Sequence, residues 1–338
     1  MFRSAMTQMP ATDDPLGPIL NVPPPALTEA ECLAAVAAHW GIDGRLEPLT
    51  SERDLNFRLR TGQGDFVLKV VNAAEDAGVT EFQTLALDHI AARDPRLPVP
   101  RAIRARDGAA SVLLAGGNRM RLLSWVEGVP MHRVVPSAAL RRAMGSMAAR
   151  LTRALEGFDH PAARHVLQWD IKHASRLRPL LPAIADADLR AICTRWLDRF
   201  DRQVGPRLMG LPWQVVHADL NSHNVLTAPD DPAHISGVLD FGDMVFTPRI
   251  CDLAVAAAYQ LNPDEAEASL MQVAEGWASI LPLLPEEAAL LRDLTAIRMV
   301  TTLAITSHRA ARQPGNAPYI LRNFPGARAG LLALPCPD

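Results

Sequence analysis

The chain has 338 residues, of which 49% are hydrophobic and 21% charged, and its formal net charge is −3. This length suffices for a two-lobed fold, while the small net charge gives no electrostatic reason to expect a nucleic-acid partner. The cysteines show no paired spacing, so we expect a reduced, cytoplasmic environment without disulfides or a zinc site. The most apolar late segment, 280–291, is interrupted by prolines and acids, and we expect no membrane partner.

The N-terminal third reads as a tail followed by a mainly β region. Residues 1–26 are rich in proline and lack an apolar core, which predicts a disordered tail. Thr28-Glu29-Ala30-Glu31 is a capping-box pattern that opens a helix to about Trp40. Period-two alternation then predicts strands, and a helical period returns between them. The strands are expected at 45–49, 56–60, 65–71, 110–115 and 119–123, and the helix at 76–92.

The rest of the chain reads as mainly helical. Helices are expected at 137–156, 170–181, 186–204, 252–260, 263–278, 285–292 and 293–312. Short strands are expected at 214–217, 225–227 and 234–240. We therefore predict an α+β fold with a small β-rich lobe at 27–123, a hinge at 124–128 and a larger helical lobe at 129–330.

The most informative motif runs from His217 to Asn224 and is followed by Asp240-Phe241-Gly242-Asp243. Phosphoryl transfer needs a carboxylate to orient the acceptor hydroxyl, and oxygen ligands to hold Mg²⁺ on the nucleotide. Asp219 is the predicted catalytic residue, although an aspartate here could also cap a turn. Asn224 and Asp240 are the predicted metal ligands. We expect His217 to brace the loop rather than act as a base.

The nucleotide would be held by residues of the β-rich region. Lys69 is the one cation in the apolar strand Phe66–Val71. Because a buried charge is costly unless it is paired, we expect anionic groups beside Lys69. We expect these anionic groups to be the nucleotide phosphates and Glu81, with Glu75 and Asp76 as alternative partners. In the other interpretation, Lys69 lies on an exposed edge strand.

The turn at residues 50–57 has no glycine, so it is not the glycine-rich loop of protein kinases. Ser51 and Asn56 in this turn could still cover phosphates, or the turn could be a plain hairpin. Ser124, Trp125 and Val126 of the hinge are expected to contact the base through backbone groups.

Three residues are candidate acceptor contacts. Asp243 could help to hold the metal or an amine, or it could cap the next segment. His223 could contact substrate or be a solvent-exposed spacer. Arg298 could clamp an acceptor carboxylate if its helix faces the pocket; the alternative is an ordinary surface helix.

These motifs resemble those of the aminoglycoside phosphotransferase and choline kinase superfamily, which has a protein-kinase-like bilobal fold. Ser51–Phe57, Val67–Val70, Glu81-Phe82-Gln83 and Trp169–Ala174 are similar to the hydroxylysine kinase branch. The resemblance implies Mg²⁺, ATP or GTP as phosphoryl donor, and a small hydroxyl acceptor that carries an amine, such as 5-hydroxylysine. A homoserine, choline or ethanolamine kinase, an aminoglycoside phosphotransferase and a nucleotide-binding pseudokinase remain alternatives. The oligomeric state is not predicted.

Overall fold

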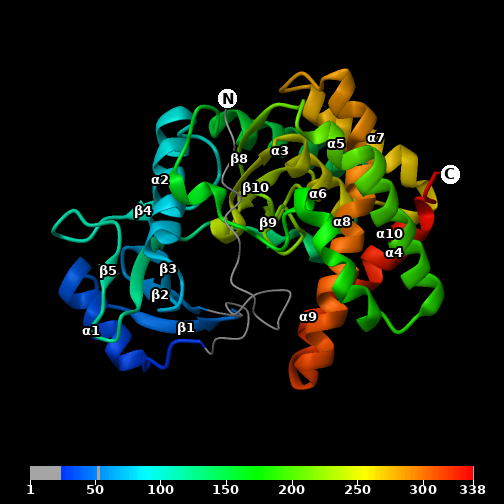
Figure 1. The fold of residues 1–338 in the computed structure, drawn as a ribbon. Helices are drawn as coiled ribbons and strands as arrows, with labels where there is room; N and C mark the ends of the chain where they lie inside the picture. Colours follow the sequence, from blue (N-terminus) through cyan, green and yellow to red (C-terminus); the bar gives the residue numbers. More distant parts are fainter. Residues whose placement is uncertain (1–23, 52–53, 338) are drawn as a thin grey trace, which may run out of the picture.

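The computed structural model describes residues 24–51 and 54–337. The tail predicted for residues 1–26 therefore lies almost wholly outside the described residues. Figure 1 shows a β-sheet in blue and cyan on one side of the molecule and a larger helical part, green to red, on the other. Within the described ranges, none of the helices has the length and hydrophobicity that crossing a membrane requires.

The main sheet is antiparallel throughout. Its strand order is β1-β2-β3-β6-β4, and β5 pairs with β6. The strands are β1 (Arg45–Leu49), β2 (Leu55–Thr61), β3 (Gly64–Val71), β4 (Ala102–Ile103), β5 (Val112–Leu113) and β6 (Arg119–Ser124). Helix α1 (Glu29–Trp40) begins with the predicted capping box, since the Thr28 hydroxyl and the Glu31 carboxylate each accept a backbone N–H.

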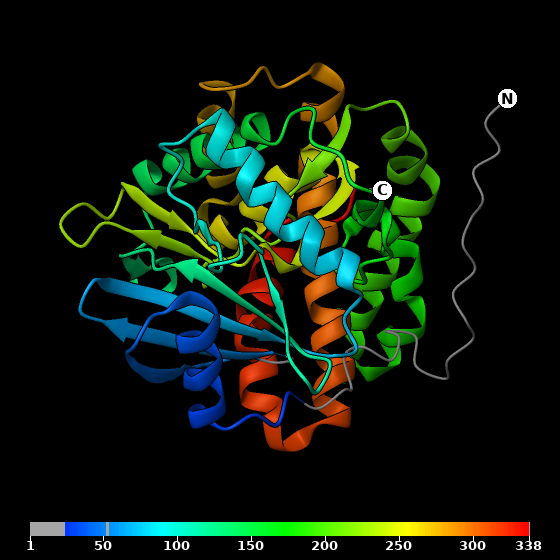
Figure 2. The ribbon, with the colours of Figure 1, turned by 90° about the vertical axis from the view of Figure 1, so that its left-hand side faces the viewer.

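Helix α2 (Ala77–Arg93) connects the sheet to the helical part. Phe82, Leu87 and Ile90 of this helix belong to the hydrophobic core of the helical part, whereas a separate core packs α1 against the sheet. In Figure 2, α2 crosses in cyan between the blue sheet and the green-to-orange helices. The relative position of the two parts therefore depends on this helix.

The helical part contains the remaining helices and two small antiparallel sheets. The sheets are β10-β9-β7 and β11-β8. Their strands are β7 (Val129–Pro130), β8 (Trp213–Val216), β9 (Val225–Thr227), β10 (Ile235–Val238) and β11 (Val245–Pro248). The helices are α3 (Ala138–Ala154), α4 (Ala187–Arg199), α5 (Gly205–Leu208), α6 (Ile250–Gln260), α7 (Ala266–Ala278), α8 (Pro285–Arg312), α9 (Ala317–Ile320) and α10 (Phe324–Ala333).

Two glycines allow α3 and α7 to pack in direct backbone contact. A Cβ at Gly145 would lie 1.9 Å from the Val273 carbonyl oxygen, and one at Gly276 would lie 1.9 Å from the Arg142 carbonyl oxygen. Any larger residue would force the two helices apart.

Several expected elements differ from the structure. The helices expected at 285–292 and 293–312 are one helix, α8, because no glycine or proline interrupts the chain between them. The segment expected as an α-helix at 170–181 forms 3-10 turns from Ile171 to Ala183, since Pro179 and Pro182 cannot donate backbone hydrogen bonds. Strands β4, β7 and β11 and helices α5, α9 and α10 were not predicted. The lobe boundaries at residues 123 and 128 stay predictions.

Candidate active site

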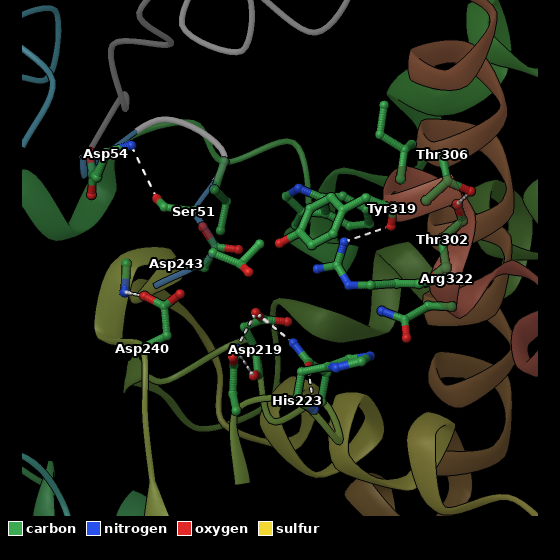
Figure 3. Close-up of a pocket in the computed structure, with 18 of the residues that line it drawn as sticks. Ser51, Asp54, Asp219, His223, Asp240, Asp243, Thr302, Thr306, Tyr319 and Arg322 are labelled. Atoms are coloured by element: carbon green, nitrogen blue, oxygen red, sulfur yellow. Dashed lines mark hydrogen bonds between the residues drawn. The ribbon is translucent and has the colours of Figure 1, made fainter. Parts of the chain in front are cut away.

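A cavity of about 530 Å³ lies where the main sheet, the loop 217–224 and the C-terminal helices meet. Figure 3 shows Ser51, Asp54 and Asp240 on one side of it and Tyr319 and Arg322 on the other, with Asp219 between them. Of the residues predicted as catalytic, metal-binding or phosphate-contacting, all except Glu81 and the hinge residues line this cavity.

The loop 217–224, here called the catalytic loop, begins with a strained residue. Ala218 has a φ of 63°, a left-handed conformation that residues with a Cβ adopt rarely. The buried carboxylate of Asp252, near the start of α6, supports this conformation because its Oδ1 accepts the Ala218 N–H at 2.8 Å. Burial raises the pKa of Asp252 to about 6. Asp252 therefore anchors the catalytic loop.

His217 braces the same loop from within the protein. Its side chain is fully buried, its Nδ1 accepts the Asp219 N–H at 3.2 Å, and its Nε2 lies 2.9 Å from the Leu239 carbonyl oxygen. These partners require a proton on Nε2 and none on Nδ1. Since burial also lowers the pKa of His217, the imidazole is neutral and structural.

The Asp219 carboxylate is held from two directions. Its Oδ2 accepts hydrogen bonds from the side-chain amides of Asn221 at 2.9 Å and Asn224 at 2.7 Å. Its Oδ1 accepts a hydrogen bond from Arg298 Nη2 at 3.1 Å. Burial raises the pKa of Asp219 to about 6, and the charge of Arg298 and the bond from Asn221 oppose that rise. A carboxylate with this pKa is mostly ionised at neutral pH and can accept a proton.

Asn224 and Asp240 provide the oxygen atoms that fit a cation. Because Asn224 Nδ2 is turned toward Asp219, its amide oxygen is the end left for a metal. The Asp240 side chain is 54% exposed, and the backbone there has a φ of 57°. No group of three or more His, Cys, Asp or Glu side chains could hold a metal in the described ranges. The pair instead suits Mg²⁺, which takes few protein ligands and completes its shell with phosphates and water.

Lys69 faces two carboxylates across the cavity, and neither of them is Glu81. Lys69 Nζ lies 3.8 Å from Asp240 Oδ1 and 3.9 Å from Asp54 Oδ2, and its side chain is 13% exposed. Lys69 is thus neither on an edge strand nor alone. Asp54 comes from the turn that replaces the glycine-rich loop.

The prediction that Glu81 pairs with Lys69 is wrong. The Glu81 side chain is 66% exposed, and Glu81 Oε2 lies 3.8 Å from His160 Nε2. Two residues along a helix are separated by about 200°, so when Gln83 faces the cavity Glu81 must face away from it. Of the two rivals, Asp76 caps α2 through the Gly78 N–H, whereas Glu75 lines the cavity.

Ser51 and Asn56 line the cavity on either side of residues 52–53, which lie outside the described residues. The Ser51 hydroxyl accepts the Asp54 N–H at 3.2 Å, and the Asn72 N–H donates to Asp54 Oδ1 at 3.1 Å. The turn is therefore tied to the end of β3 and places Asp54 beside Lys69.

The hinge residues Ser124, Trp125 and Val126 do not line the cavity. Strand β6 pairs with β3 as far as Ser124, and the Trp125 N–H donates to the Asp65 carbonyl oxygen at 3.2 Å. These pairings occupy backbone groups that were expected to bind the base. The Trp125 ring instead stacks on the Arg58 guanidinium, whose carbon lies 4.0 Å from the ring centre.

Comparison with known proteins agrees with this geometry. The model of the phosphotransferase enzyme family matches residues 45–291. The chain belongs to this family. Hydroxylysine kinase of Danio rerio is 29% identical over 317 residues, covering 88% of each chain. Homoserine kinase of Methylocella silvestris is 29% identical over 290 residues, covering 78% of this chain and 84% of its own.

Solved structures share the fold at lower identity. A microcompartment-associated aminopropanol kinase superposes with a TM-score of 0.67 at 20% identity, covering 87% of this chain and 94% of its own. An amicoumacin kinase in complex with AMP-PNP, Ca²⁺ and Ami superposes with a TM-score of 0.65 at 13% identity, covering 88% and 93%. The predicted α+β, protein-kinase-like fold is confirmed. The chain is a small-molecule kinase, a phosphotransferase that acts on a hydroxyl group.

Asp243 and His223 both line the cavity. The His223 ring centre lies 4.3 Å from that of His132, and burial lowers the pKa of His223. A neutral imidazole here can exchange hydrogen bonds with a substrate without adding charge.

Arg298 is not on a surface helix, because its side chain is only 2% exposed. Its donors contact Asp219, the Trp169 carbonyl oxygen at 3.1 Å and the Tyr259 hydroxyl at 3.3 Å. In this arrangement the Arg298 guanidinium holds the catalytic loop, and its donors are not directed at an acceptor carboxylate.

Several lining residues received no role from the sequence. Some of them lie within the quoted motifs, and others lie in segments that no motif marks. Thr302 and Thr306 could be suspected from their polar side chains in an apolar helix, but the segments after residue 312 carry no recognisable pattern. Figure 3 shows Tyr319 and Arg322 facing the cavity opposite Asp240. The unrecognised residues are Asn221, Gln83, Asp54, Trp169, Tyr259, Arg309, Tyr319, Arg322 and Asn323.

Proposed function

We propose that this phosphotransferase transfers the γ-phosphoryl group of ATP or GTP to the hydroxyl of a hydroxylated amino acid, with 5-hydroxylysine as the first candidate. The observation that carries the proposal is the single cavity in which Asp219, Asn224, Asp240 and Lys69 meet. In the proposed roles, Asp219 accepts the hydroxyl proton while Lys69 binds the phosphates. Asn224 and Asp240 would hold Mg²⁺, which neutralises charge on the phosphates when it is bound.

The charged residues that line the cavity favour an acceptor that carries both an amine and a carboxylate. Asp243 offers a negative charge to the amine, whereas Arg309 and Arg322 offer positive charge to a carboxylate. The Arg322 guanidinium carbon lies 3.9 Å from the Tyr319 ring centre, and Arg322 Nη1 donates to the Tyr319 carbonyl oxygen at 2.9 Å, so the side chain is oriented before any acceptor binds. Relatives named hydroxylysine kinase and homoserine kinase support the same class.

The second candidate is an aminoglycoside O-phosphotransferase, because solved aminoglycoside phosphotransferases share the fold. Polyamine drugs need several acids in the acceptor site, and the arginines that line this one make such binding less favourable. Resistance of a sensitive host that expresses the protein would support this candidate.

The experiment is nucleoside diphosphate release with Mg²⁺, using ATP and GTP separately against 5-hydroxylysine, homoserine, 1-amino-2-propanol, ethanolamine and choline. Asp219→Ala serves as the blank. Release with an amino acid, absent from the blank, supports the proposal. Release with amino alcohols alone would discard the amino-acid class and keep the kinase chemistry. Nucleotide binding without release for any acceptor would favour a regulatory pseudokinase.

A further inference from the structure

Three polar side chains lie opposite one another on neighbouring strands of the main sheet. The register pairs Asn56 of β2 with Lys69 of β3, and Lys69 with Arg121 of β6. Side chains at directly opposed positions share one face of a sheet, so both cations point toward the same side. Like charges in this arrangement repel, and an anion bound between the sheet and α2 would relieve the repulsion.

Arg121 is the more deeply buried of the two cations. Its side chain is 3% exposed, and its three acceptors on α2 are all uncharged: Gln83 Oε1 at 2.6 Å, Thr84 Oγ1 at 3.2 Å and the Thr80 carbonyl oxygen at 3.4 Å. Within residues 24–51 and 54–337, no carboxylate contacts this guanidinium directly. A buried charge without an ionic partner is costly. Glu75, Asp54 and Asp240 attract the Arg121 guanidinium from a distance, but none of them neutralises it by direct contact.

Gln83 connects this charge to the cavity. Its side chain is buried but lines the cavity, and its Oε1 is committed to Arg121. An amide has one oxygen and one nitrogen, so Nε2 must face elsewhere. Nε2 has no acceptor in the described part of the chain and, unlike Arg121 Nε, is not sealed from solvent. The cavity thus receives an oriented N–H donor from the helix that was expected to supply a carboxylate.

We propose that Gln83 and Arg121 form a second phosphate-binding element of the nucleotide site, beside Lys69. Gln83 Nε2 donates to a phosphate oxygen, while Arg121 fixes the orientation of the amide and supplies positive charge behind it. This inference rests on the proposed function, because it assumes that a nucleotide occupies the cavity. The inference assigns a phosphate contact to Gln83, whose side chain is uncharged.

The test measures equilibrium binding by calorimetry, without any acceptor. The ligands are the non-hydrolysable triphosphates AMP-PNP and GMP-PNP with Mg²⁺, and adenosine and guanosine, which lack phosphate. Gln83→Leu is expected to weaken triphosphate binding about tenfold or more, since it removes a hydrogen bond to a charged group. Nucleoside binding is expected to stay within twofold of wild type. Glu81→Gln, on the opposite face of the same helix, is the matched control and is expected to change neither.

A second variant tests the charge. Gln83→Glu would give Arg121 the carboxylate that it lacks, so the thermal midpoint should rise while triphosphate affinity falls below that of Gln83→Leu. The inference is overturned if Gln83→Leu binds triphosphates as wild type does, or loses nucleoside and triphosphate affinity equally. Wild-type protein that binds no nucleotide would instead overturn the proposed function, and this inference with it.

Discussion

Arg298 Nη2 donates a hydrogen bond to Asp219 Oδ1 at 3.1 Å, and this ion pair joins helix α8 to the catalytic loop. The other donors to the Asp219 carboxylate, Asn221 and Asn224, belong to the catalytic loop itself. Arg298 is therefore the contact that ties the carboxylate to a rigid helix. Active-site groups keep a productive geometry when rigid elements support them.

We predict that Arg298→Met lowers kcat by about 100-fold, because small misplacement of a catalytic group costs about that factor. The KM for nucleotide should stay within threefold, while Arg298→Lys, which retains one donor and the charge, should recover part of the loss. Steady-state kinetics with saturating acceptor measures all three. Arg199→Met is the control, since Arg199 pairs with Asp293 of the same helix, at 2.9 Å, outside the cavity. Equal kcat losses in Arg298→Met and the control would mean that both act through stability alone.

The pH dependence of the reaction follows from Asp219. Its pKa is raised to about 6, chiefly by burial, and only the ionised carboxylate can accept the hydroxyl proton. We expect kcat/KM to fall as the pH drops through about 6, about tenfold for each further unit. A pH–rate profile from 5 to 9 measures this. Activity that stays constant down to pH 5 would show that burial does not raise the pKa of the catalytic base to about 6.

Asp252 should prove necessary for the geometry of the catalytic loop. Asp252→Leu removes the acceptor of the Ala218 N–H and should lower the free energy of unfolding by about 1–3 kcal/mol, together with kcat. Asp252→Asn keeps an oxygen in place and should cost much less. Urea denaturation followed by tryptophan fluorescence compares the two variants. The anchoring role fails if leucine and asparagine are tolerated equally.

Arg322 is expected to recognise the acceptor carboxylate. Arg322→Gln should raise the KM for an amino-acid acceptor about tenfold or more and leave the KM unchanged for the decarboxylated form of the same acceptor. Initial rates with the two acceptors give the comparison. If both KM values rise together, Arg322 shapes the pocket without recognising the carboxylate.

The sequence predicted those parts of the site that a short motif encodes. Asp219, Asn224 and Asp240 follow from local spacing, and the structure brings all three into one cavity with Lys69. Glu81 was misassigned because a motif does not state which face of a helix meets the sheet. Gln83 is only two residues from Glu81 along α2. The packing of α2 against β6 shows that Gln83, and not Glu81, faces the sheet.

Contacts between distant segments could not be predicted. The pair Arg298–Asp219 joins residues 79 positions apart, and only the packing of α8 makes them neighbours. At the hinge, backbone groups of Ser124 and Trp125 take part in strand pairing and in a contact with Asp65 that no motif encodes, and base binding there stays a prediction. Residues without a motif, such as Tyr319 and Arg322, need the fold before they can be assigned to the site.

The most direct test of the account is detection of a phosphorylated product by ³¹P nuclear magnetic resonance, with wild type and Asp219→Asn compared at pH 7.5. The incubation contains ATP or GTP, Mg²⁺ and 5-hydroxylysine. A phosphomonoester signal that grows in step with nucleoside diphosphate in the wild type, and is absent in a folded, nucleotide-binding Asp219→Asn, is the predicted result. An equal phosphomonoester signal from both proteins would contradict the role of Asp219 on which the account depends.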